Sequence, residues 1–239
     1  MAYKRVVVPD QPLQGNELTA ALVGIGMNFA APGAAEPNLE DALLGASVEG
    51  MEHDDLRVLS VLVTWLGIHH PWINADRMVR AARAQRAVRV RCFWSAVGVW
   101  LHRDRRLARL ADLYDGPRLP LLRAGNAFQV KRKGEDERFS GGPLQVPAGV
   151  LRDRDRDVLS PTELAKRHRS YYYRVLMGPS YRADMWAALE RDPTLSAAEL
   201  ARLTYGSFAS AWQVRHDWAL LVAQGEVMAG LVHGRESRT

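Results

Sequence analysis

The chain is poor in cysteine and has no long hydrophobic run. Its 239 residues include one cysteine, Cys92, which excludes an internal disulfide framework. The most apolar run, residues 58–68, is too short to cross a bilayer and ends at His69-His70-Pro71. No basic, apolar leader opens the sequence. We therefore expect a soluble protein of the reducing cytoplasm that makes no contact with a membrane.

Common catalytic and cofactor-binding motifs are also missing. The sequence has no phosphate-binding loop of the G-x-x-x-x-G-K-[ST] type, no G-x-S-x-G and no C-x-x-C. His53-Asp54-Asp55 has the order of a His-Asp pair in metal-dependent phosphohydrolases, but such a site needs further histidines. His69 and His70 are adjacent, so their side chains point to different sides of a helix. We expect no metal, no cofactor and no catalytic residue, and a hydrolase is the third hypothesis.

Acidic residues are scarce in the middle of the chain. Residues 77–133 hold 15 basic and 3 acidic side chains, whereas residues 1–76 hold 3 basic and 10 acidic ones. Four arginines recur every three residues from Arg77 and would repel one another without a screening anion, although a solvated helix face is the alternative. More arginines follow up to residue 109. Such asymmetry indicates a polyanion or an acidic protein as partner. The phosphate- or partner-binding residues that we predict are Arg77, Arg80, Arg83, Arg86, Lys131, Arg132 and Lys133.

The pattern of apolar residues predicts a mainly α protein with a small β element. Residues 54–67 are apolar almost all round, which is typical of the central buried helix of a bundle. Residues 128–133 alternate and predict a strand within an extended stretch. Ser160-Pro-Thr-Glu163 is a capping box, so a helix should run from Pro161 into the three tyrosines at 171–173. We expect a helical bundle over residues 1–116, the β element and a charged linker over 117–158, and a helix-turn-helix domain over 159–239.

The C-terminal part predicts three helices in succession. Apolar residues are spaced for a helix over residues 180–191, which Asp192-Pro193 stops. Ser196-Ala-Ala-Glu199 is a second capping box and predicts a short helix from Ala197 to about Leu203. Gly206 stands where a left-handed turn residue is wanted, and residues 208–223 read as a third, longer helix. A short helix, a turn with glycine and a long helix have the outline of a helix-turn-helix.

The third helix of this series has two different faces. At about 100° per residue, one face gathers apolar residues and should pack on the first two helices. That face comprises Phe208, Ala211, Val214, Trp218, Leu221 and Val222. The other face carries small and hydrogen-bonding groups that suit a major groove, although Trp212 and Leu220 also lie toward it. The predicted DNA-binding residues are Ser207, Ala209, Ser210, Gln213, Arg215 and His216.

The runs Ser180-Tyr-Arg-Ala-Asp-Met-Trp and Leu195 to Val214 carry a resemblance to known proteins. They resemble the helix-turn-helix or winged-helix domains of bacterial regulators, and more specifically those of type IV (abortive-infection) antitoxins, which accompany nucleotidyltransferase toxins. Those antitoxins carry the domain at the N-terminus, whereas here it is near the C-terminus. The resemblance covers about a fifth of the chain and implies a DNA-binding transcriptional regulator, with a cognate toxin as partner.

Two main hypotheses follow. The first is a DNA-binding regulator that reads double-stranded DNA, and because such proteins usually bind paired half-sites, a homodimer is expected. The second is a protein-interaction module that neutralises or scaffolds a toxin or another acidic protein without binding DNA. In that case the three helices serve only for packing.

Overall fold

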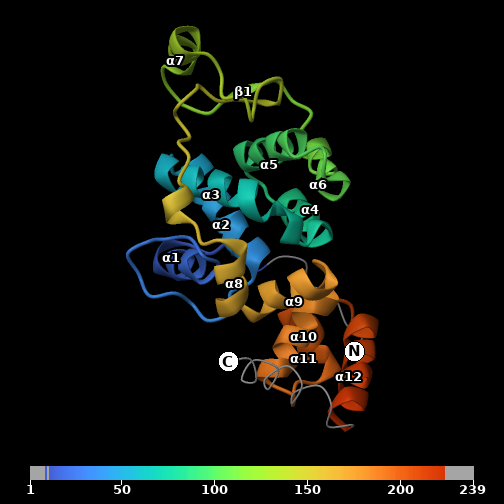
Figure 1. Cartoon of the computed structure of the whole chain (residues 1–239). Coiled ribbons are helices and arrows are strands. Elements are labelled where there is room, and N and C mark those ends of the chain that lie inside the picture. Colours follow the sequence, from blue (N-terminus) through green and yellow to red (C-terminus); the bar gives the residue numbers. More distant parts are fainter. Residues whose placement is uncertain (1–8, 10, 224–239) are drawn as a thin grey trace.

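The computed structural model describes residue 9 and residues 11–223, and within them it contains 12 α-helices and one tiny two-stranded sheet (Figure 1). The prediction of a mainly α protein with a small β element is thus confirmed. No helix in this part of the chain is long and apolar enough to cross a membrane. The part of the predicted helix-turn-helix domain beyond residue 223 lies outside the described residues.

The N-terminal bundle is organised around two helices, α2 and α3. Helix α2 packs against α1, α3, α4 and α5, and α3 is buried along most of its length. Trp65 of α3 is fully buried and donates its indole N–H to the carbonyl of Ile25 (2.9 Å). The predicted central helix is thereby confirmed. The helices are α1 (Gly15–Gly24), α2 (Leu39–Glu52), α3 (Leu56–His69), α4 (Ala75–Arg83), α5 (Val88–Trp100) and α6 (Arg105–Ala108), with 3₁₀ turns at His70–Trp72 and Ala111–Leu113.

The β element is smaller than expected. Strands β1 (Leu119–Pro120) and β2 (Leu144–Gln145) pair in parallel. The predicted strand over residues 128–133 is wrong, because these residues form helix α7 (Asn126–Lys133). Gly125 and Gly134 flank it with positive φ values of 71° and 78° and so turn the chain at both ends. Phe128 is 64% exposed. The alternation of apolar and polar residues in this stretch therefore does not correspond to a sheet with one buried face.

The helix expected from Pro161 into the tyrosines is divided in two at His168. Helix α8 (Pro161–Arg167) begins with the predicted capping box of Ser160 and Glu163. His168 leaves the helical conformation, and its Nδ1 accepts the backbone N–H of Tyr171 (3.2 Å), which caps α9 (Arg169–Met177). Its Nε2 donates to the carbonyl of Pro37 (2.9 Å). This long-range contact holds the break in place.

The three C-terminal helices have the predicted bounds: α10 (Tyr181–Arg191), α11 (Ala197–Leu203) and α12 (Phe208–Ala223). The capping box of Ser196 and Glu199 is present. Gly206 was expected in the left-handed conformation, but Tyr205 adopts it (φ 57°). Gly206 instead lies against the side chain of Met185, where a Cβ would overlap the terminal methyl group. We call α10–α12 the three-helix unit.

The hydrophobic residues form two cores that meet within α9. The first core runs from α1 to β2, includes Leu164 of α8, and ends with Tyr171. The second begins at Tyr173 and fills the three-helix unit as far as Trp218. Leu164 packs with the bundle although it follows the predicted boundary at residue 158.

Buried charges join the two cores. Arg174 of α9 lies between Glu40 of α2 and Asp184 of α10, with N–O distances of 2.6–2.9 Å. Arg77 of α4 is paired with Asp41 of α2, which also accepts the Tyr205 hydroxyl (2.7 Å). These contacts fix the three-helix unit against the bundle.

Candidate nucleic-acid interface

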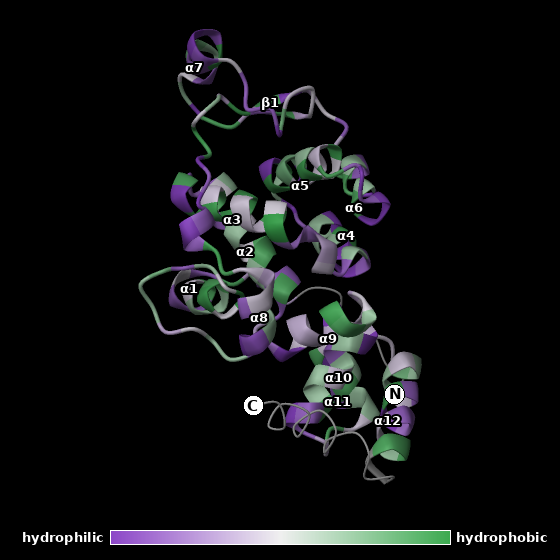
Figure 2. Ribbon diagram, viewed as in Figure 1, coloured by the Kyte–Doolittle hydropathy of each residue, from purple (hydrophilic) through white to green (hydrophobic). Residues whose placement is uncertain are grey.

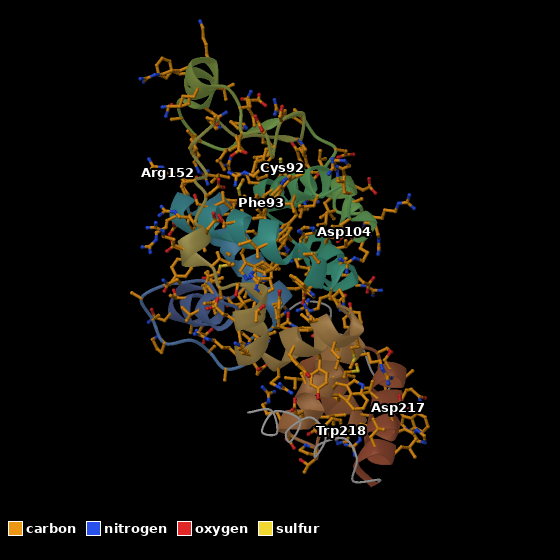
Figure 3. All side chains as sticks on the ribbon, in the orientation of Figure 1. Cys92, Phe93, Asp104, Arg152, Asp217 and Trp218 are labelled. Carbon is orange, nitrogen blue, oxygen red and sulfur yellow. The ribbon has the colours of Figure 1, made fainter. Side chains whose placement is uncertain are left out.

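The inner face of α12 is sealed by the other two helices of the unit. Ala211, Val214 and Trp218 are at most 7% exposed, as predicted. Trp218 packs on Trp186 of α10 with ring centroids 5.2 Å apart. In Figure 3, Trp218 lies on the side of α12 toward α10 and α11. Leu221 is partly buried, and the side chain of Val222 lies outside the described residues. Phe208 was expected on the inner face but is 44% exposed.

The outer face of α12 is open along the predicted DNA-binding residues. Ala209, Ser210, Gln213 and His216 are exposed. Ser207 and Arg215 are half-buried. Among the described elements, α12 packs chiefly on α10 and α11. Within residues 11–223, the face is therefore open to solvent.

Hydrogen bonds hold the polar side chains of this face. The Ser207 hydroxyl accepts the backbone N–H of Ser210 (3.0 Å) and lies 2.8 Å from the Ser210 hydroxyl, which caps the start of the helix. Gln213 donates from Nε2 to Asp217 (2.9 Å). Asp217 also pairs with Arg182 of α10 (2.8 Å), and the hydrogen bond from Arg182 lowers the pKa of this carboxyl. Gln213 is thus held in place with its carbonyl oxygen and one N–H still available.

Aromatic and basic side chains continue the outer face toward α11. Trp212 stacks on His216 with ring centroids 5.9 Å apart and is 57% exposed. These two rings, Arg215 and Ala197 line a shallow pocket of about 270 Å³. Leu220 is 51% exposed, as the spacing predicted. The face therefore offers stacking and apolar contacts beside its hydrogen-bonding groups.

The predicted arginine row is not one surface. Arg77 is fully buried, with its guanidinium paired to Asp41 and stacked 3.6 Å from the ring centroid of Tyr205, so it cannot meet a phosphate. Arg80 is exposed but pairs with Asp76 (3.0 Å). Arg83 at the end of α4 and Arg86 beyond it are exposed. The expectation of one continuous arginine face is therefore wrong. Residues spaced by three do not stay on one side of a helix, and Arg77 points into the interface between the two cores.

The predicted basic residues of α7 lie far from α12. Lys131, Arg132 and Lys133 are exposed in the last turn of α7. Helices α7 and α12 stand at opposite ends of the molecule (Figure 1). These three residues therefore belong to a separate surface.

A basic groove lies between the bundle and the three-helix unit, and sequence analysis did not predict it. Its walls are Arg105, Arg106 and Arg109 from the region of α6, the start of α4, and the start of α10, and it measures about 640 Å³. In Figure 1, α4, α6 and α12 follow the same edge of the molecule. The sequence showed these arginines but not their neighbours, because the walls are about 70 residues apart along the chain.

The residues considered for catalysis have structural roles. Asp55 caps α3 by accepting two backbone N–H groups, Asp54 pairs with Arg123 (2.7 Å), and His53 contacts Glu49 (2.9 Å). The Cys92 thiol is buried, which raises its pKa to about 11 and makes it a poor nucleophile at neutral pH. Residues 9 and 11–223 contain no group of three His, Cys, Asp or Glu side chains placed to hold a metal ion.

Comparison with protein families, with curated proteins and with solved structures gave no match to this chain. Its function therefore has to be argued from the chemistry and placement of its own residues, above all those of the open face of α12.

Proposed function

We propose that this chain is a DNA-binding protein that places α12 in the major groove of a duplex. One observation carries the proposal: α12 is sealed on its apolar side and open on a polar side within the same four turns. A helix with its side chains is about 10–12 Å wide, which fits a major groove of about 12 Å. The open side chains in question are Ala209, Ser210, Gln213 and His216.

The residue types of this face fit the edges of base pairs. A glutamine amide can donate to N7 and accept from N6 of adenine, and Gln213 keeps both capacities beside Asp217. The methyl group of Ala209 can contact a thymine methyl group, and the Ser210 hydroxyl can bond to either type of base. Arg215, half-buried at the side of the helix, supplies a positive charge that suits a phosphate.

The biological role proposed is transcriptional regulation. The likeness of residues 180–214 to type IV antitoxins supports an operator-binding protein that is paired with a nucleotidyltransferase toxin. A protein of this type binds two half-sites as a homodimer, with centres about 34–36 Å apart or a multiple of this.

Selection from a random duplex library tests the proposal. The wild-type protein should enrich a defined motif, and Gln213→Ala should relax the preference at one base pair, with a loss of about 1–3 kcal/mol there. Gln11→Ala is the matched control, because Gln11 is exposed in the segment before α1. If the wild-type protein enriches no motif, operator reading is excluded.

The second candidate function is binding of a protein partner through α12. It is favoured by Trp212 and Leu220, whose exposed fractions of 57% and 51% are high for such large apolar side chains. A co-expressed nucleotidyltransferase should then co-purify in a fixed ratio, and Leu220→Asp should abolish this. Absence of co-purification, together with a DNA sequence preference that Gln213→Ala relaxes, would assign the helix to DNA.

A further inference from the structure

The three-helix unit lacks the positive charge that a DNA-binding protein needs. Residues 180–223 hold 4 basic and 5 acidic side chains, a net charge of −1. Most of the affinity of proteins for DNA comes from basic side chains that neutralise phosphates and release counterions. If α12 reads bases, the groups that hold the backbone must come from another part of the chain.

The basic groove beside α6 has this charge. Arg105, Arg106 and Arg109 line it, and all three are exposed. In Figure 2, the loop before α6 and the beginning of α6 are hydrophilic, whereas most of the adjoining α5 is apolar. The opposite wall is the start of α10, so the groove borders the unit that carries α12.

The acidic side chains at the groove are already neutralised. Asp76 is contacted by Arg80 (3.0 Å), by Arg109 (4.0 Å) and by the Tyr181 hydroxyl (3.0 Å). Asp104 is held by Arg106 at 2.6 Å. Four arginines therefore stand against two aspartates, and the surface keeps a positive charge. The arginines are Arg80, Arg105, Arg106 and Arg109.

Arg105 and Arg109 are the arginines with capacity for a ligand. Within the part of the chain that the structure describes, the Arg105 side chain makes no hydrogen bond or ion pair. Arg109 is 57% exposed and reaches Asp76 only at the limit of an ion pair. Arg106 is less available, because it also donates to the carbonyl of Pro71 (3.0 Å).

A buried amide and two helix starts add further donors. Asn74 lines the groove and is 3% exposed, and its side-chain Nδ2 has no hydrogen-bond partner among the described residues. Its Oδ1 accepts the backbone N–H of Arg77 and so begins α4. Helix α10 begins at the same groove with Ser180 as its cap. The positive ends of both helix dipoles favour an anion there.

We propose that this groove binds the phosphate backbone of the DNA next to the stretch read by α12, with Arg105 and Arg109 as the contacting residues. The inference rests on the proposed function and extends it. It gives the bundle a direct part in binding, and the buried charges between the cores hold the groove and α12 in one fixed geometry. Phosphate is the shared chemistry, and its source is a DNA strand rather than a free ion.

The test is a titration of a labelled random-sequence duplex, followed by fluorescence anisotropy, at several salt concentrations between about 50 and 200 mM. The variants are the double substitution Arg105→Ala/Arg109→Ala and a control with the same loss of charge, Arg152→Ala/Arg156→Ala, at two exposed arginines that follow the β element. The groove variant should weaken binding to all duplexes and lower the slope of log K against log salt by about 2, since each phosphate contact contributes about 0.9. The control should keep the wild-type slope.

A conservative variant and a second ligand complete the design. Arg105→Lys/Arg109→Lys should restore most of the slope, because a phosphate accepts a lysine as a point charge. Inorganic phosphate serves as the free-ion probe, and a loss of phosphate binding without a change in DNA binding would overturn the inference. If the groove variant binds DNA like the wild type while Gln213→Ala still relaxes the sequence preference, the inference about the groove is wrong. The proposed function then remains intact. If the wild-type protein binds no duplex, the proposed function fails with it.

Discussion

Arg174 and Glu40 form a bidentate ion pair in the interior of the protein, with N–O distances of 2.6 and 2.9 Å and side chains at most 1% exposed. Asp184 accepts two further hydrogen bonds from the same guanidinium, at 2.7 and 2.9 Å. Burial alone would lower the pKa of Arg174, but the two carboxylates outweigh it and the pKa is raised. Three helices from both cores thus meet at one cation, which makes the position of the three-helix unit depend on it.

Removal of this cation should destabilise the protein strongly. Arg174→Met leaves Glu40 and Asp184 buried without their main partner, so we expect the free energy of unfolding to fall by about 3–5 kcal/mol. Arg169→Met is the control on the same helix, because Arg169 also pairs with a glutamate, Glu190, but is 40% exposed. Its loss should stay within about 1 kcal/mol. Urea denaturation of both variants at neutral pH measures the difference, and equal losses would contradict the role of Arg174.

The stability of the protein should fall in mild acid because of His69. Its Nε2 must donate to the carbonyl of Leu159 (3.0 Å), so Nδ1 accepts the Tyr171 hydroxyl (2.7 Å) and the ring is neutral. Burial lowers the pKa of His69 to about 4 from an ordinary value of 6.5. Between these two values the unfolded chain binds the proton and the folded chain does not. Stability therefore decreases as the pH falls from about 6.5 toward 4.

The size of this pH effect can be measured by urea denaturation at pH 6.5 and pH 5. His69→Gln should remove about 1.5 kcal/mol of the loss that the wild-type protein shows over this interval. The readout is a difference between two pH values, so a general destabilisation by the substitution does not disturb it. His102→Gln is the control at an exposed histidine. A pH dependence that is unchanged in His69→Gln would show that the proton is taken up elsewhere.

Two glycines inside helices should respond to alanine with opposite signs. At Gly98 of α5, a Cβ would overlap the backbone nitrogen of Ala111, so the 3₁₀ turn Ala111–Leu113 would have to move. We expect Gly98→Ala to cost about 1–3 kcal/mol or more. At Gly67 of α3, the nearest atoms are those of Trp100 at 3.8 Å, so Gly67→Ala should stabilise by about 0.5–1 kcal/mol. Thermal unfolding of the two variants measures this difference in stability. If both substitutions had the same effect, α5 and the 3₁₀ turn would not be in close contact.

Local signals in the sequence predicted much of the helical structure. The capping boxes at Ser160 and Ser196 placed the starts of α8 and α11, because both their partners lie within three residues. The periodicity of residues 208–223 gave the sealed and open faces of α12 for the same reason. Phe208 departed from it at the first turn, where the α12 helix has only begun.

Long-range partners could not be predicted. Arg77 was expected on a surface because its partners, Asp41 and Tyr205, stand 36 residues before it and more than 100 residues after it. The break at His168 depends on the carbonyl of Pro37, 131 residues away. The basic groove likewise needs the start of α10 beside α6. Composition supplied the arginines of the candidate site, and only the fold showed which of them are accessible.

The orientation of α12 can be tested with two of its tryptophans. Trp218 is 7% exposed and packs on Trp186, so Trp218→Ala should leave a cavity in the second core and cost about 3–5 kcal/mol. Trp212 is 57% exposed on the outer face, and Trp212→Ala should change stability by no more than about 0.5 kcal/mol. Urea denaturation of both variants gives the comparison. Because the substitution and the helix are the same, a reversed order would mean that the face assigned to DNA is the packed one.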